Sequence, residues 1–142
     1  MLKGLNPILG PDMLAVLRAM GHGDEIAIVD GNYPAETQAA RLIRCDGLAL
    51  PPVLDAVLSV LPVDDFVDQA IFRSVNMTAI DTPDPVHQEM EAICARHCPG
   101  LAVVPLVGQA FYDRVKAAHA IIHTSEPRLY ANIVLRKGVI YP

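Results

Sequence analysis

The stretch GHGDEIAIVD, residues 21–30, indicates the fold class most clearly. Its second half, Glu25 to Asp30, is a short apolar run bounded by charges, a pattern typical of a strand that is buried on both faces. Such strands occur where helices cover both sides of a sheet. The first half places His22 between two glycines, which frees the backbone at a cost in stability. A core strand is thus preceded by a histidine that is free of side-chain crowding.

Helices and strands alternate along the rest of the chain. Apolar spacing with proline or glycine boundaries predicts the helices, and short apolar runs predict the strands. We expect helices over residues 11–20, 51–61, 82–98 and 110–120, and strands over 25–30, 42–45, 69–75, 101–107, 119–124 and 132–138. Pro105 disfavours a fully paired, interior position for its strand. The pattern predicts a single α/β domain, residues 1–142, with a central, mostly parallel sheet flanked by helices in three layers.

Composition excludes several classes of function. Of the 142 residues, 52% are hydrophobic and 19% are charged, so we expect a folded core, with some surface buried between subunits. The formal net charge is −5 without a basic run, which argues against nucleic acid or an anionic membrane as partner. The three cysteines resemble no disulfide framework, and Pro7 and Pro11 interrupt the N-terminus where a signal peptide needs an apolar run. A reduced, cytoplasmic setting is therefore expected.

His22 and Asp30 are the first candidates for chemistry. An imidazole titrates near neutral pH and passes a proton either way, which suits acid–base catalysis. Alternatively, its charged form would favour the end of the preceding helix. Asp30 is suited to holding sugar hydroxyls or orienting a histidine, but an Asx turn with Gly31 and Asn32 is favoured by the sequence alone. One residue precedes the strand and the other follows it, so they need not meet within one chain.

Tyr130 and Asn132 are the second pair of candidates. In an extended chain both side chains point to the same face, and a phenol with an amide offers donors and acceptors to hydroxyl groups. The alternative is a tyrosine packed in a loop with its hydroxyl in water. Three neighbouring residues are expected on the solvated or interface face of a helix: Tyr112, Asp113 and Arg114.

No motif in the chain indicates a metal or an organic cofactor. Cys94, His97 and Cys98 lie within one helical turn, but their spacing matches no usual zinc pattern. G-x-S-x-G, P-loop and G-x-G-x-x-G motifs do not occur. We predict no cofactor and no metal. The remaining histidines show no partner in the sequence and are expected in solvent or core positions: His87, His119 and His123.

Four stretches together resemble the D-ribose pyranase / L-fucose mutarotase family. They follow in the family's order, at similar spacing, over nearly the whole chain. The combination of Gly-His-Gly-Asp, a downstream Asp and a late Tyr-x-Asn is specific, and Arg44-x-Asp46-Gly47 resembles the fucose branch more than the ribose branch. The stretches are MGHGDEIAIVDGNYPA (20–35), LIRCDG (42–47), AFYDR (110–114) and YANIVLRKGV (130–139).

This resemblance implies a cofactor-free cytoplasmic protein that assembles into a ring, commonly a homodecamer of two pentameric rings, with active sites at subunit interfaces. It implies His22 as the catalytic acid–base residue and Asp30 as a catalytic carboxylate that orients the sugar. Tyr130 is implied as a catalytic and sugar-binding residue that reaches in from a neighbouring subunit, beside Asn132 as a second sugar-binding group. Fucose-branch members carry an arginine shortly before the Phe-Tyr pair, where this chain offers Gln109 as a substrate-binding candidate.

The implied activity is isomerisation of a monosaccharide, the interconversion of α and β anomers of L-fucose or a related aldose. Ring opening takes a proton from the anomeric hydroxyl and gives one to the ring oxygen, which acid–base groups achieve without a cofactor. Two alternatives remain open. One is a ribose-type pyranase that exchanges six- and five-membered rings, and the other is a non-catalytic sugar-binding or transport-accessory protein, which the missing arginine favours.

Overall fold

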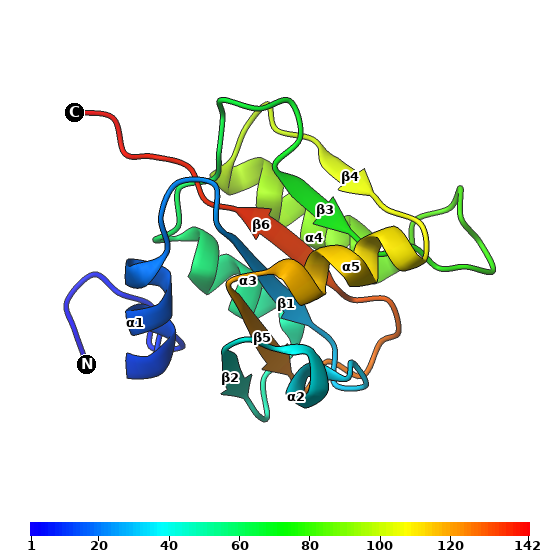
Figure 1. Ribbon diagram of the computed structural model, residues 1–142, viewed down its shortest axis with the longest axis horizontal. Helices are drawn as coiled ribbons and strands as arrows, with labels where there is room; N and C mark the ends of the chain where they lie inside the picture. Colours follow the sequence, from blue (N-terminus) through cyan, green and yellow to red (C-terminus); the bar gives the residue numbers. More distant parts are fainter.

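Six strands form one mixed sheet in the computed structural model, which describes residues 1–142 (Figure 1). The predicted elements are present with shifts at their ends, and the short helix α2 was not predicted. The strands are β1 (Glu25–Val29), β2 (Leu42–Cys45), β3 (Ile71–Arg73), β4 (Val103–Pro105), β5 (Ala120–Thr124) and β6 (Ile133–Arg136). The helices are α1 (Pro11–Ala19), α2 (Ala35–Gln38), α3 (Leu50–Leu58), α4 (Pro85–His97) and α5 (Gln109–Ala117).

The strand order is β2-β5-β1-β6-β3-β4, and only β6 runs against its neighbours. This confirms the predicted mostly parallel sheet. Strand β4, which contains Pro105, lies at an edge, where a missing backbone N–H leaves no ladder hydrogen bond unmade.

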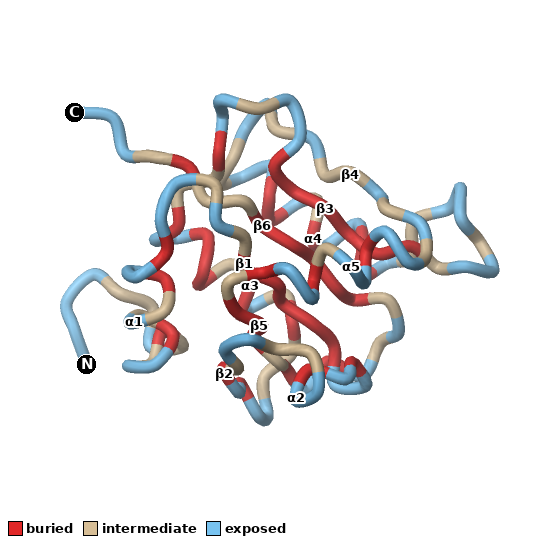
Figure 2. The backbone as a smooth tube through the Cα atoms, viewed as in Figure 1, coloured by how far each residue is buried: buried red, intermediate tan, exposed pale blue.

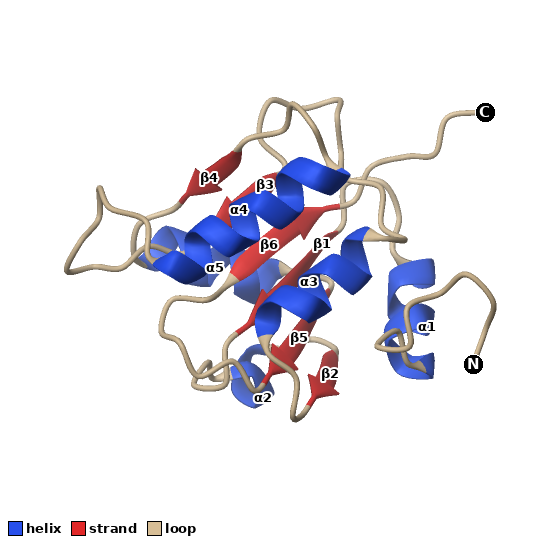
Figure 3. Cartoon of the chain, turned by 180° about the vertical axis from the view of Figure 1, so that it is seen from behind, coloured by secondary structure: helices blue, strands red, loops and turns tan.

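Helices cover both faces of the sheet, as the doubly apolar β1 predicts. Ile26 and Ile28 face the apolar cluster that contains α1, α3 and α4, while Ala27 and Val29 face the cluster that contains α2 and α5. All four side chains are buried because alternate residues of a strand point to opposite faces. Figure 1 shows α5 in front of the sheet with α3 and α4 behind it, Figure 3 gives the reverse view, and Figure 2 shows the buried strands between them.

Strand β6 lies beside β1 and runs in the opposite direction. Its antiparallel register with β1 pairs Ile28 with Ile133 and Glu25 with Arg136. Residues that precede β6 therefore lie beside the carboxyl end of β1, and residues that end β6 lie beside its amino end.

No helix of the chain has the length and apolar character to cross a membrane.

Candidate functional site

A small cavity lies beyond the carboxyl end of β1, and we call it the carboxyl-end cavity. Its volume is about 190 Å³, below the roughly 300–1,000 Å³ of pockets for drug-sized ligands, which suits a ligand with one sugar ring. Three sequence-predicted site residues meet here. The lining consists of Asp30, Asn32, Tyr33, Pro34, Tyr112, Leu129, Tyr130 and Asn132.

Asp30 and Asn132 hold each other by reciprocal hydrogen bonds. The backbone N–H of Asp30 donates to Oδ1 of Asn132 at 2.9 Å, and Nδ2 of Asn132 donates to Oδ2 of Asp30 at 2.9 Å. The N–H of Asn32 donates to Oδ1 of Asp30 at 2.9 Å, so the Asx turn favoured by the sequence is present as well. Antiparallel pairing of β1 with β6 brings these residues together from positions 102 residues apart.

Burial dominates the electrostatics of Asp30. It raises the pKa of this carboxyl group, although the hydrogen bonds from Asn32, Asn132 and Tyr33 act in the opposite direction. No lysine, arginine or histidine lines the carboxyl-end cavity. A carboxylate has about four acceptor positions, so Asp30 keeps capacity for a ligand hydroxyl beside the hydrogen bonds from Asn32, Asn132 and Tyr33.

Tyr130 reaches the carboxyl-end cavity through an unusual backbone conformation. Its φ is +61°, and it is the only residue other than glycine with a positive φ. The chain is therefore not extended at Tyr130, which belongs to a turn before β6. Both side chains nevertheless line the same cavity. The left-handed conformation costs a residue with a side chain about 1–2 kcal/mol, so the surrounding structure must hold it.

Two tyrosines form an aromatic wall of the cavity. Tyr33 and Tyr112 stack with ring centroids 5.7 Å apart and an interplanar angle of 20°. The hydroxyl of Tyr33 donates to Gln38 at 2.8 Å, which anchors the ring against α2. Burial raises the pKa of Tyr33, so its phenol stays protonated.

Two predictions for α5 have different outcomes. Arg114, expected on a solvated or interface face, instead donates to both carboxylate oxygens of Glu25 at 2.7–3.1 Å and lies 3.5 Å from the ring centre of Phe72. Gln109 begins α5 and donates to Asp113 at 2.8 Å, and it does not line the carboxyl-end cavity. Its contact with a sugar stays a prediction.

His22 lies at the other end of β1, in a charged cluster that we call the amino-end cluster. Its Nε2 atom is 3.2 Å from Oδ2 of Asp64, which also accepts a hydrogen bond from Nε of Arg136 at 2.8 Å. Asp64 is fully buried, whereas 45% of the His22 side chain is exposed. The ring of Phe66 meets the imidazole edge to face, with centroids 5.4 Å apart. The structure therefore presents an open imidazole on a fixed, buried carboxylate.

Asp64 stays ionised in this cluster. Burial alone would raise its pKa, but hydrogen bonds from Arg136, from the N–H of Phe66 and from His22 lower it. Asp64 is not among the residues predicted from the sequence, because nothing in the loop after α3 marks one of its acidic residues as buried. Its only signal in the sequence is an acidic pair, Asp64-Asp65, directly before the aromatic Phe66.

Two glycines allow the amino-end cluster to form. Gly23 has a φ of +88°, a conformation that suits glycine because it lacks a Cβ atom. Gly138, just after β6, lies so close to the loop after α3 that a Cβ atom would be 2.7 Å from the carbonyl oxygen of Val63. That close approach holds Asp64 beside β6, and its backbone N–H donates to the carbonyl of Arg136 at 3.0 Å.

The amino-end cluster and the carboxyl-end cavity do not meet within one chain. Strand β1 has five residues, so at about 3.3 Å per residue it alone separates His22 from Asp30 by about 16 Å. The sequence left this open, and the structure places the two residues at opposite ends of the strand. A site that contains both needs a second copy of the chain.

Other sequence candidates lie elsewhere. His97 is 2.7 Å from Asp55 and links α4 to α3, while the three cysteines are free. His87 lies in the core, one of the two positions expected for it, and both of its ring nitrogens are hydrogen bonded. A buried ring nitrogen of His119 and one of His123 have no partner in the chain.

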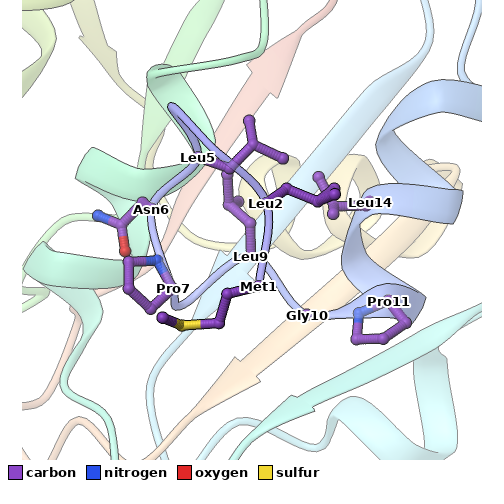
Figure 4. Close-up of a pocket in the computed structure, with 9 residues that line it drawn as sticks. All are labelled: Met1, Leu2, Leu5, Asn6, Pro7, Leu9, Gly10, Pro11 and Leu14. Atoms are coloured by element: carbon purple, nitrogen blue, oxygen red, sulfur yellow. The ribbon is translucent and has the colours of Figure 1, made fainter.

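A second cavity, of about 390 Å³, lies between the N-terminal segment and α1 (Figure 4). Its side chains are mainly leucine, methionine and proline, and Asn6 is the one polar side chain among them. Because no titratable side chain lines it, this cavity offers no acid–base chemistry.

Known proteins resemble this chain over nearly its whole length. Residues 3–140 match the RbsD / FucU transport protein family. The chain is 40% identical to a fucose mutarotase of Homo sapiens, covering 98% of this chain and 94% of that one. It is 36% identical to an L-fucose mutarotase of Glaesserella parasuis, with coverage of 98% and 96%. It is also similar to the crystal structure of a fucose mutarotase from Streptococcus pneumoniae in complex with L-fucose, with 39% identity, a TM-score of 0.90, and coverage of 99% and 100%.

Proposed function

Because the chain belongs to the RbsD / FucU transport protein family, we propose that it is a sugar mutarotase acting on L-fucose or a related aldose. The observation that carries this proposal is the carboxyl-end cavity, where a buried carboxylate, an amide and a phenol surround a space of about 190 Å³. Such groups position a polyhydroxylated ligand by hydrogen bonds. The fucose mutarotases that resemble the chain over nearly its full length support this substrate class.

In the proposed reaction, the bond between the anomeric carbon and the ring oxygen breaks. One group removes the proton of the anomeric hydroxyl while another protonates the ring oxygen, which gives the open-chain aldehyde. Rotation about the bond to the carbonyl carbon and reversal of both proton transfers close the ring as the other anomer. We assign these transfers to His22 and Tyr130, because both are side chains that donate and accept protons.

Asp30 and Asn132 position the sugar in this proposal. Asp30 accepts hydrogen bonds from sugar hydroxyls at its remaining acceptor positions, and the reciprocal bonds with Asn132 keep its carboxylate fixed. Gln109, at the beginning of α5, is proposed as an additional contact in place of a cationic side chain. A proton shuttle between oriented groups contributes about 10²–10⁴-fold, and no step of this reaction requires a cofactor.

We propose that two copies of the chain complete each site. His22 and Asp64 of one copy then face the carboxyl-end cavity of the next, which matches the separation of the two half-sites along β1. Exposed apolar side chains accompany both half-sites, and such surfaces mark protein interfaces. Phe66 and Tyr141 lie at the amino-end cluster, and Tyr112 and Leu129 at the carboxyl-end cavity.

Contacts of this head-to-tail kind close into rings when the rotation permits. A homodecamer of two pentameric rings is the assembly that we propose, as the resemblance to the family implies. A cytoplasmic location is likewise proposed, and the three free cysteines support it because a reducing compartment keeps thiols unpaired.

Saturation-transfer NMR of sugar anomers tests the activity. We expect the protein to accelerate α–β exchange of L-fucose, with D-ribose and D-glucose as comparison sugars. Acceleration only of pyranose–furanose exchange in ribose would favour a pyranase. Sugar-dependent thermal stabilisation without any acceleration would favour a binding protein.

A mixing experiment tests the shared site. His22→Ala and Tyr130→Phe each remove one half-site, so each variant alone should lose most of the acceleration. When the two variants are denatured together, refolded and reassembled at equal amounts, about a quarter of the sites contain an intact His22 and an intact Tyr130 from different chains. Recovered activity near that fraction supports sites shared between chains, whereas no recovery would contradict them. Each variant refolded alone is the control.

A further inference from the structure

Tyr130 is held through its backbone carbonyl. This carbonyl accepts hydrogen bonds from the hydroxyl of Ser74 at 2.7 Å and from Nε2 of His87 at 2.9 Å. Both donors are distant from Tyr130 in the sequence, since Ser74 follows β3, the sheet neighbour of β6, and His87 lies in α4. The left-handed turn at Tyr130 is thus secured by two groups outside the turn itself.

The hydrogen bonds of His87 define its tautomer. The backbone N–H of Asp84 donates to Nδ1 of His87 at 3.1 Å, so Nδ1 carries no proton. The proton is then on Nε2, which donates it to the carbonyl of Tyr130. One neutral imidazole therefore caps the beginning of α4 and fixes the turn that carries Tyr130.

The surroundings of His87 keep the ring neutral. His87 is fully buried, and burial lowers its pKa from the usual 6.5. The charged groups that face it are Arg73 on β3, Asp84 before α4, and Glu91 on the next turn of α4, where Glu91 accepts a hydrogen bond from Arg73 at 2.9 Å. A protonated ring would present a second N–H to the donor N–H of Asp84, and the cap would be lost.

We propose that His87 is a positioning residue that sets the place of Tyr130 in the carboxyl-end cavity through the Nε2–H hydrogen bond to the carbonyl of Tyr130. The role rests on the proposed function of Tyr130 in proton transfer to the sugar. Ser74 connects the same carbonyl to the rest of the site, because its Oγ is also 3.5 Å from Nδ2 of Asn132. The geometry of phenol and carboxylate in the cavity then depends on a residue that touches no ligand.

Two substitutions separate this role from the capping role. In His87→Asn the side-chain oxygen replaces Nδ1 and keeps the cap, but no donor reaches Tyr130. In His87→Gln the longer amide replaces Nε2 and keeps the donor, but the cap acceptor is lost. His97→Asn, at the other end of α4, is the matched control because it removes a contact with Asp55 that is remote from the cavity.

For anomer exchange we expect kcat of His87→Asn to fall about tenfold with KM changed less than about twofold, because a small displacement of a reacting group costs rate. His87→Gln should retain most of the wild-type kcat, and His97→Asn should retain all of it. Equal losses in both His87 variants would show that a donor in place of Nε2–H does not restore the rate, which would overturn the proposal. Full activity in His87→Asn would overturn it as well.

A ligand-free measurement separates this inference from the proposed function. ¹⁵N NMR of the imidazole in the wild-type protein should show the neutral Nε2–H tautomer of His87. The backbone amide signals of Tyr130 and Ala131 should shift in His87→Asn more than in His87→Gln. If the wild-type protein accelerates anomer exchange of no sugar, the proposed function fails. The NMR signals still test whether His87 positions Tyr130. An Nδ1–H tautomer would overturn the proposed hydrogen bond from His87 to Tyr130, whether or not the protein accelerates anomer exchange.

Discussion

Oδ2 of Asp64 lies 3.2 Å from Nε2 of His22 and accepts a hydrogen bond from Nε of Arg136 at 2.8 Å. The carboxylate is fully buried and the imidazole is half exposed, so the carboxylate orients the ring while leaving the rest of it open to a ligand. The same arrangement explains the glycine that follows His22. Gly23 approaches the guanidinium of Arg136 so closely that a Cβ atom would be 3.1 Å from Nη2.

Replacement of Asp64 by Asn should lower the rate of anomer exchange at least about tenfold, because a histidine in acid–base catalysis depends on the carboxylate that orients it. The Asn side chain keeps an acceptor for the N–H of Phe66, so we expect the protein to fold. NMR exchange rates at saturating sugar measure the effect. Asp65→Asn is the control, since Asp65 is exposed and accepts only from Tyr141. A wild-type rate in Asp64→Asn would remove the carboxylate from the mechanism.

Gly138→Ala should destabilise the protein by about 1–3 kcal/mol, because the new methyl group overlaps backbone atoms that cannot move independently. Its Cβ atom would be 2.7 Å from the carbonyl oxygen of Val63 and 2.8 Å from Cα of Asp64. Urea unfolding measures the change in the free energy of unfolding. Gly10→Ala is the matched control because a Cβ atom there meets nothing within 4 Å. Equal stability of the two variants would contradict the close approach.

Arg114→Lys should cost about 1–2 kcal/mol, because an ammonium group replaces neither the two-pronged contact with a carboxylate nor the stacking on an aromatic ring. Arg114 makes both contacts, with Glu25 and with Phe72. The same substitution at Arg96, which is 65% exposed beside Asp55, should change stability by less than about 0.5 kcal/mol. Thermal and urea unfolding of both variants distinguish the two sites. A neutral Arg114→Lys would show that the pair contributes nothing.

The depressed pKa of His87 predicts a loss of stability in mild acid. The folded pKa lies below the usual 6.5, so the unfolded chain binds the proton first as pH falls. The stabilisation is complete above pH 6.5 and is lost as pH falls through the folded pKa. Urea unfolding between pH 8 and pH 5, in about one-unit steps, should show the stability advantage of the wild type over His87→Gln shrinking as pH falls. An advantage that stays constant with pH would mean that His87 does not titrate on unfolding.

Local patterns were sufficient to predict most of the fold. The apolar run from Glu25 to Asp30 indicates a strand with helices on both of its faces, because only a doubly covered sheet buries every side chain of such a run. Proline and glycine boundaries locate the helices within a few residues of their observed ends. Helix α2 was not predicted because four residues, Ala35–Gln38, are too few to show a helical period.

The candidate site was only partly visible in the same patterns. His22, Asp30, Tyr130 and Asn132 are marked by residue type and by resemblance to a family, and three of them line one cavity. Neither the acidic pair that contains Asp64 nor the residues around His87 reveal a role, because each residue gains its role from a partner more than 40 residues away in the chain.

By itself, the sequence determined the element order, the buried central strand and the residue types available for acid–base chemistry, since these follow from local periodicity and side-chain chemistry. Tertiary structure alone decided which residues meet. The reversed direction of β6 brings Asn132 to Asp30 at one end of β1 and Arg136 to Asp64 and His22 at the other. Strand direction depends on long-range backbone pairing, which no local pattern encodes.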